Sequence, residues 1–195
     1  MPKNTHALEH VLDQLIELGK QQDEVTVGDM RAELAQRSFG PFLFVPALLE
    51  ISPIGGVPGV PTFLGLIVAI AAVQLVLGRT DFWLPQVIVR RGVKGDRMVR
   101  AMEKMRKLAR VIDKLLRPRL GALTGAIWTR LAGLLAVLCM LGVPPLELVP
   151  FASTVPFAAI ALIGLGLMGR DGLFMLLGMV VATGAIAVVV FQLLV

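Results

Sequence analysis

The stretch GLFMLLGMVVATGAIAVVVFQLLV, residues 172–195, carries no charged side chain. As a helix it would be about 36 Å long, which exceeds the bilayer hydrocarbon core of about 30 Å. Apolar residues make up 56% of the whole chain and aromatic residues only 6%, so the excess is aliphatic. A single soluble core cannot hide so many aliphatic side chains in 195 residues, and the sequence therefore predicts a membrane protein.

Other apolar segments precede this stretch. We predict clear membrane spans at about 121–142, 152–169 and 172–195. The first is interrupted by Arg130, and the loop 143–151 that follows it contains three prolines. Proline lacks a backbone donor and breaks helices, so a turn is expected in this loop.

A helical hairpin is expected over residues 39–78. A helix over 39–51 would be roughly 20 Å long, too short to cross the hydrocarbon core comfortably. A Gly/Pro-rich turn follows and ends at Pro61, after which an uncharged helix of about 26 Å is expected over 62–78. The turn either reaches the far side of the bilayer or re-enters it, where broken backbone needs cover from protein or a water cavity.

Charge is segregated along the chain. Residues 1–38 hold four basic and seven acidic side chains, whereas residues 79–119 hold thirteen basic and four acidic ones. Basic segments stay in the cytoplasm, and the first 35 residues contain no apolar leader. We therefore expect a multi-pass protein whose N-terminus and basic segment are cytoplasmic and whose C-terminus is periplasmic.

The N-terminal residues predict two helices. Residues 5–18 carry apolar side chains at spacings of three and four, which is typical of an amphipathic helix, and this helix is expected to end near Gly19. A second short helix begins at Thr26, where Thr26 and Asp29 fit a capping box, and runs to about Arg37. We expect this cytoplasmic pair to pack on the membrane part.

The basic segment contains an amphipathic helix over 98–116. Its apolar stripe either lies on the anionic inner leaflet or pairs with a second copy of the chain as a short coiled coil. Anionic phospholipids and a homodimer are thus the expected partners, and Gly178 and Ala182 add a small-residue packing pair in the last span. The candidate lipid-surface residues are Arg97, Arg100, Lys104, Arg106, Lys107, Arg110 and Lys114. Nucleic acid is not expected, because the helix over 98–116 lacks aromatic residues and membrane spans flank the basic segment.

The two halves of the chain look related at an offset of 91 residues. Pro53 then aligns with Pro144, Gly78 with Gly169, and Arg79 with Arg170. The predicted fold is an all-α membrane protein of two related hairpins, with Gly/Pro-rich and possible re-entrant turns, the basic cytoplasmic helix and a final span. We divide it into a cytoplasmic segment, 1–38, and a membrane domain, 39–195, in which 79–119 is cytoplasmic.

Charged and polar residues within apolar segments are candidate substrate- or ion-binding residues, because they cost free energy in lipid unless they face a partner or cavity. Arg130 either snorkels to the inner interface or pairs with Glu50 or a bound anion. Glu50 either lies at the outer interface or takes up and releases a proton beside the broken turn. Gln74 bonds across helices or lines a polar path.

Three further candidates lie at the predicted cytoplasmic helix ends. Arg79, Arg170 and Asp171 either complement helix dipoles and fix the topology, or the two arginines hold a phosphate or pyrophosphate head group. No metal site or cofactor is expected, because the chain has one cysteine and two histidines, spaced i,i+4. No phosphate loop or hydrolase triad is present either, and we expect a protein that is not an enzyme.

Several short motifs, in this order, make residues 37–172 resemble the ExoD family of exopolysaccharide-synthesis proteins. They are Arg37-Ser38-Phe39-Gly40-Pro41, the Gly/Pro turn ending at Pro61, Gln74 with Gly78-Arg79, Trp83-Leu84-Pro85, Arg117-Pro118-Arg119, Pro144-Pro145 and Arg170-Asp171-Gly172. Glu147 departs from the neutral polar residue expected there. The resemblance adds Arg37 to the candidates and implies a bacterial inner-membrane protein without an assigned reaction.

Three functions are compatible with this resemblance. The first is support of exopolysaccharide synthesis or export, by handling an anionic or lipid-linked saccharide intermediate. The second is proton- or ion-coupled transport that affects pH tolerance, because Glu50 before a Pro-rich turn is similar to DedA-type transporters. The third is a scaffold that binds other polysaccharide-synthesis proteins through the basic helix and the N-terminal hairpin.

Overall fold

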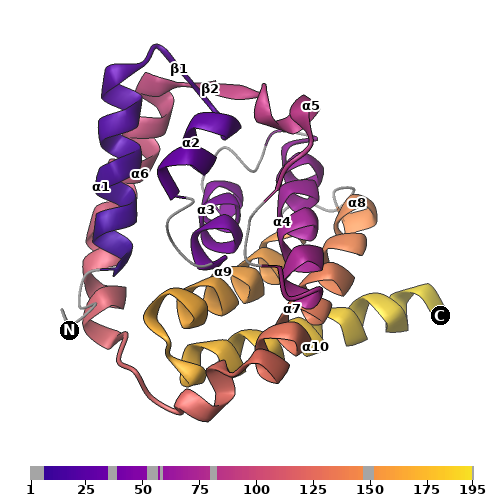
Figure 1. Cartoon of the computed structure of the whole chain (residues 1–195). Coiled ribbons are helices and arrows are strands. Elements are labelled where there is room, and N and C mark those ends of the chain that lie inside the picture. The colour runs from indigo at the N-terminus through magenta and orange to yellow at the C-terminus, as the bar shows by residue number, and fades with distance from the viewer. Residues whose placement is uncertain are drawn as a thin grey trace.

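The computed structural model describes residues 7–34, 39–51, 57, 59–79, 83–146 and 152–194. These residues are mostly helical, as predicted, with one short two-stranded ribbon (Figure 1). The elements in chain order are α1 (Ala7–Gln21), β1 (Glu24–Thr26), α2 (Val27–Leu34), α3 (Gly40–Ile51), α4 (Val60–Val76), α5 (Gln86–Val89), β2 (Gly92–Lys94), α6 (Gly95–Leu115), η2 (Gly121–Thr124), α7 (Ala126–Leu141), α8 (Val143–Leu146), α9 (Thr154–Gly169) and α10 (Gly172–Leu194).

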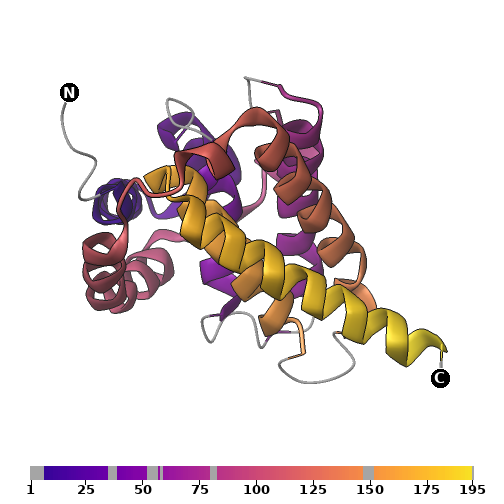
Figure 2. The ribbon, with the colours of Figure 1, turned by 90° about the horizontal axis from the view of Figure 1, so that it is seen from below.

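Helices α1 and α6 lie side by side at one end of the molecule (Figures 1 and 2). The ribbon β1–β2 joins them, with Val25 paired to Val93 in an antiparallel register. The apolar stripe of α1 is buried, and so are Met98 and Met102 of α6, because the two amphipathic faces cover each other. The ribbon was not anticipated from the sequence.

The packing of α1 corrects the expectation for the amphipathic basic helix. We expected its stripe to meet lipid or a second copy of the chain, but α1 of the same chain covers it. The N-terminal half of the sequence supplies an apolar face of matching length, and two such faces inside one chain meet without the entropy cost of association. Ion pairs from α1 to α6, Asp13 with Arg106 and Glu9 with Arg110, follow the same contact.

The local structure of α1 and α2 can be compared with the prediction. The capping box at α2 is confirmed, because the Thr26 N–H donates to Asp29 Oδ2 at 2.9 Å and the Asp29 N–H donates to Thr26 Oγ1 at 3.1 Å. The first helix ends near Gly19 as expected, since the last residue of α1 is Gln21. Gly19 itself lies where α1 meets the start of α6, close to Gly95 and Val99.

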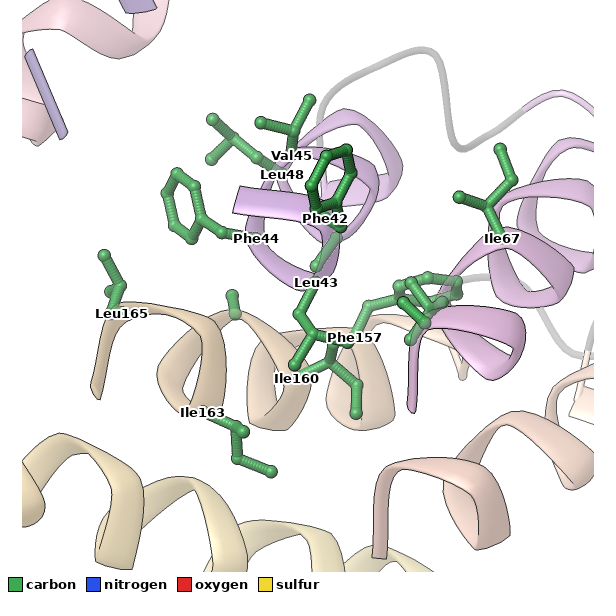
Figure 3. Packing of buried hydrophobic residues seen from close by; sticks show 14 of the residues in the cluster. Phe42, Leu43, Phe44, Val45, Leu48, Ile67, Phe157, Ile160, Ile163 and Leu165 are labelled. Carbon is green, nitrogen blue, oxygen red and sulfur yellow. The ribbon is translucent and has the colours of Figure 1, made fainter. Parts of the chain in front are cut away.

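Apolar helices form the rest of the structure. Helix α3 packs against α9 and α4 against α7, so each helix of the first hairpin contacts one helix of the second half of the chain. Figure 3 shows Leu43 of α3 directed towards Phe157 and Ile160 of α9. The two backbones meet closely, since a Cβ added to Gly40 would lie 2.8 Å from the Gly164 carbonyl oxygen. Small residues allow this approach, as is common between helices in membranes.

Helix α10 is long and uncharged, packs on α9 and α7, and extends beyond the bundle (Figure 2). Within the described residues it is the one helix, over Gly172–Phe191, long and apolar enough to cross a membrane, and only 22% of its most apolar window is buried. A core helix of a soluble protein would be mostly covered by its own fold. The apolar helices α3, α4, α7 and α9 are shorter, with 12 to 17 residues each.

The bounds of α3, α4, α7 and α9 lie within about five residues of the helical segments expected there, and the arrangement of these helices as two related hairpins stays a prediction. Most of the first turn, 52–56 with residue 58, and the turn 147–151 lie outside the described residues, so re-entry stays a prediction. Gly178 packs in the same chain against Ala159 and Ile163 of α9, and Ala182 is buried. The homodimer therefore stays a prediction that these two residues do not support.

Candidate functional site

The site begins at the C-terminal end of α4, which closes in a Schellman motif. The Arg79 N–H donates to the Gln74 carbonyl at 3.0 Å, and the Gly78 N–H donates to the Leu75 carbonyl at 3.1 Å. Gly78 has a φ of +68°, which a glycine adopts without the strain of a Cβ atom. The motif turns the chain away from the helix axis and leaves the Arg79 side chain exposed at the helix end.

Arg130 lies against the same helix end. It belongs to the first turns of α7, which packs on α4, and its guanidinium extends over Gly78. A Cβ added to Gly78 would lie 2.9 Å from one Arg130 terminal nitrogen, so the absence of a side chain at Gly78 makes room for the guanidinium. Among the described residues neither Arg79 nor Arg130 has an acidic partner. Asp81, between α4 and Trp83, lies outside the described residues.

Gln74 fixes the third component, the chain segment at Trp83. Its amide nitrogen donates to the Trp83 carbonyl at 2.8 Å and to the Ile70 carbonyl at 3.0 Å, and its amide oxygen accepts the Trp83 N–H at 2.7 Å. Both functional ends of the buried amide are thereby satisfied. Gln74 therefore bonds to the returning chain, where we had expected a partner across helices or a polar path, and it positions the half-exposed Trp83 indole.

A shallow groove of about 560 Å³ lies along α4, beside Gln74, Arg79 and Trp83. Its apolar wall is one face of α4, and Arg79 and Trp83 stand at its end. The residues that line it are Ala69, Ile70, Val73, Gln74, Leu77, Arg79 and Trp83. An apolar groove lined by a guanidinium and an indole has the chemistry of a site for an amphiphilic anion.

Arg170 and Asp171 form a second helix end with a different environment. The Asp171 N–H donates to the Gly166 carbonyl at 2.9 Å, which closes α9 in a similar motif with Arg170 in the left-handed region at a φ of 50°. The left-handed residue is Gly78 in one motif and Arg170 in the other. The two turns are therefore offset by 92 residues, one more than the offset of 91 at which the sequence halves were aligned. The exposed Arg170 does not line the groove at Arg79.

Asp171 is fully buried and bonds to two segments. One carboxylate oxygen accepts the Leu173 N–H at 3.0 Å and caps α10, while the other accepts the Arg117 N–H at 3.0 Å. Asp113, which the sequence did not single out, acts in the same way at α1. Its two oxygens accept the Leu8 and Glu9 N–H groups at 3.0 and 2.9 Å. Both acids stabilise helix N-termini from within the protein.

Glu50 lies at the last turn of α3, at the other end of the apolar helices. Its carboxylate oxygen Oε1 accepts a hydrogen bond of 2.6 Å from the Ser153 hydroxyl, and both side chains are buried. The predicted alternative of a Glu50–Arg130 pair is wrong, because Arg130 lies over Gly78 at the opposite end of α4. Serine directly before an apolar helix is a helix-start signal, but it did not indicate a contact with Glu50.

The remaining candidates fall into two groups. All seven candidate lipid-surface residues of α6 are exposed. Arg100, Arg106 and Arg110 are bonded to Asp96, Asp13 and Glu9, whereas the other four, Arg97, Lys104, Lys107 and Lys114, have no ion-pair partner in the described part of the chain. Arg37, like Glu147, lies outside the described residues. No group of three His, Cys, Asp or Glu side chains that could hold a metal ion occurs in the described ranges.

One helix able to cross a membrane, four shorter apolar helices and arginines at helix ends are features of a helical membrane protein. The chain matches the family described as "Exopolysaccharide synthesis, ExoD" over residues 8–191, and it belongs to this family. It is 33% identical over 157 residues to Protein ExoD of Rhizobium meliloti (strain 1021), a match covering 76% of this chain and 62% of that protein. No solved structure matches the chain.

Proposed function

We propose that this chain is a bacterial inner-membrane protein that supports exopolysaccharide synthesis or export by holding an anionic, lipid-linked saccharide intermediate at the end of α4. The observation that carries the proposal is Arg79 in the lining of an apolar groove along α4, with the Arg130 guanidinium next to the neighbouring Gly78. Membership of the ExoD family supports the link to exopolysaccharide synthesis.

The chemistry of such an intermediate matches the site in three respects. Its phosphate groups suit two guanidinium groups, which form short, charge-assisted and often bidentate bonds to phosphate oxygens. Its lipid chain suits the apolar face of α4, over Ala69 to Leu77. Trp83 lies where an indole is favoured, between the hydrocarbon and the polar head-group region.

Charge also favours this end of α4 as the cytoplasmic one. Arg79 is the first residue of the basic segment 79–119, which the positive-inside rule assigns to the cytoplasm. An intermediate assembled in the cytoplasm would reach the groove directly from the inner leaflet. An offset of about 91 residues makes α3 correspond to α7 and α4 correspond to α9. The contact of α3 with α9 then corresponds to the contact of α7 with α4, so the packing is compatible with two related hairpins.

The proposal is tested in the native bacterium with the gene deleted and variants supplied in its place. Arg79→Ala with Arg130→Ala should abolish secreted polymer and cause lipid-linked saccharides to accumulate, with a normal amount of protein in the membrane. Arg91→Ala, which removes an exposed arginine between α5 and β2, is the matched control and should leave both quantities unchanged. Normal polymer from the double variant would contradict head-group binding at this site.

A second candidate function is proton- or ion-coupled transport, which the buried Glu50 favours. Deletion of the gene distinguishes the two functions before any point variant is made. If polymer and lipid-linked intermediates are both unchanged while growth at altered pH is impaired, the transport function replaces the first proposal.

A further inference from the structure

A closed polar contact joins the ends of α3 and α9. Glu50 is 4% exposed and Ser153 6% exposed, and the Ser153 hydroxyl donates to Glu50 Oε1 at 2.6 Å. The second oxygen, Oε2, is buried and has no hydrogen-bond partner among the described residues. Ser153 occupies the position that normally caps α9, yet its hydroxyl caps no backbone N–H and bonds to Glu50 instead.

No cation compensates the carboxyl group in the described residues. Helices α4 and α9, which pack on α3, carry no titratable side chain, and Glu50 is the only one on α3. Helix α2 also contacts α3. Its titratable residues are Asp29, which is bonded to Thr26, together with Arg31 and Glu33, whose side chains lie outside those that the structure describes. Glu147, in the segment before Ser153, lies outside the described residues.

A buried carboxylate with one hydroxyl donor and no cation is costly, because an unpaired charge loses its hydration without compensation. A proton removes the charge, and the neutral hydroxyl that it leaves costs less to bury without a partner than the charged oxygen does. Among the described residues, Glu50 belongs to no group of three His, Cys, Asp or Glu side chains that could hold a metal ion.

We infer that Glu50 and Ser153 form a proton-binding site, in which Glu50 is protonated while α3 and α9 are held together. Loss of the proton leaves a carboxylate that requires water or a cation, so ionisation favours separation of these helix ends. The inference does not depend on the proposed function, because Arg79 and Arg130 lie at the opposite end of α4.

The test is infrared spectroscopy of the full chain, purified in detergent, which detects the carbonyl band of a protonated carboxyl group. Wild-type protein at neutral pH should show this band, and Glu50→Gln should lack it. Gln has the same shape and can accept the Ser153 bond, so folding should persist. Glu103→Gln removes an exposed acid on α6 and is the matched control, in which the band should remain.

A second variant tests the role of Ser153. Ser153→Ala should shift the frequency of the band, because the carbonyl loses its donor, while the band itself remains. Absence of the band from the wild type at neutral pH, or its persistence in Glu50→Gln, would overturn the inference. A band that appears only after sodium and potassium are removed would also overturn it, since the occupant would then be a metal cation.

Discussion

Replacement of Asp171 by alanine should strongly destabilise the protein. The side chain is fully buried and accepts two backbone N–H groups, from Leu173 at the start of α10 and from Arg117 before η2. Loss of a helix N-cap costs about 0.5–2 kcal/mol. Leaving the partly buried Arg117 N–H without an acceptor costs about 1–3 kcal/mol more. We therefore expect Asp171→Ala to lower the free energy of unfolding by about 3 kcal/mol.

Asp171→Asn is the informative second variant. Asparagine has one acceptor oxygen and one NH₂ group, so it can serve either Leu173 or Arg117 but not both. Its cost should be about half that of alanine, whichever way the amide is oriented. Both variants are measured by guanidinium unfolding of the detergent-purified protein, followed by circular dichroism. Equal costs for Ala and Asn, or an alanine cost under about 0.5 kcal/mol, would refute the bridging role argued here.

Three further outcomes follow from the other contacts. Asp113→Ala should cost about 2–3 kcal/mol and release α1 from α6, measured as faster amide hydrogen exchange at Leu8, because its carboxylate accepts two N–H groups of α1. Gly78→Ala should cost about 1–2 kcal/mol in thermal unfolding, since alanine is strained at a φ of +68°; unchanged stability would contradict the turn geometry. Reversing Lys104 and Lys107 to glutamate should weaken flotation with anionic vesicles, but not with neutral ones, if α6 contacts lipid head groups.

The structure also changes which residues test the lipid surface. Charge reversal at Arg106 or Arg110 would place two like charges together, because these arginines bond to Asp13 and Glu9 of α1. Such variants would disrupt the packing of α1 on α6 whatever the role of the surface. Lys104 and Lys107 have no such partner within the described residues, so their reversal reports on the surface itself.

Local features of the chain were predictable, because they depend on residues only a few positions apart. The Thr26–Asp29 capping box, the turn at Gly78 and the uncharged final helix each follow from adjacent side chains and backbone preferences. The short motifs that resemble the ExoD family could also be recognised from adjacent residues. Gln74 was recognised as unusual on an apolar helix, although its partner, the Trp83 backbone, could not be named.

Contacts between distant segments could not be read from the sequence. Glu50 and Ser153 are 103 positions apart, and Leu8 and Asp113 are 105 apart. The partner of an amphipathic helix depends on all the other apolar faces in the chain, and not on the spacing of its own residues. The stripe of α6 fitted lipid, a second copy or α1 equally well by its spacing alone.

The sequence by itself determined that the chain is helical, where its apolar helices lie and where its positive charge is concentrated. These properties depend on composition and periodicity, which survive any arrangement of the helices. Only the tertiary structure decided that Arg130 lies over Gly78, that α1 covers α6, and that Glu50 meets Ser153. Uniformly apolar helices specify no partner, so close packing of glycines and of the few polar groups selects among the possible pairings.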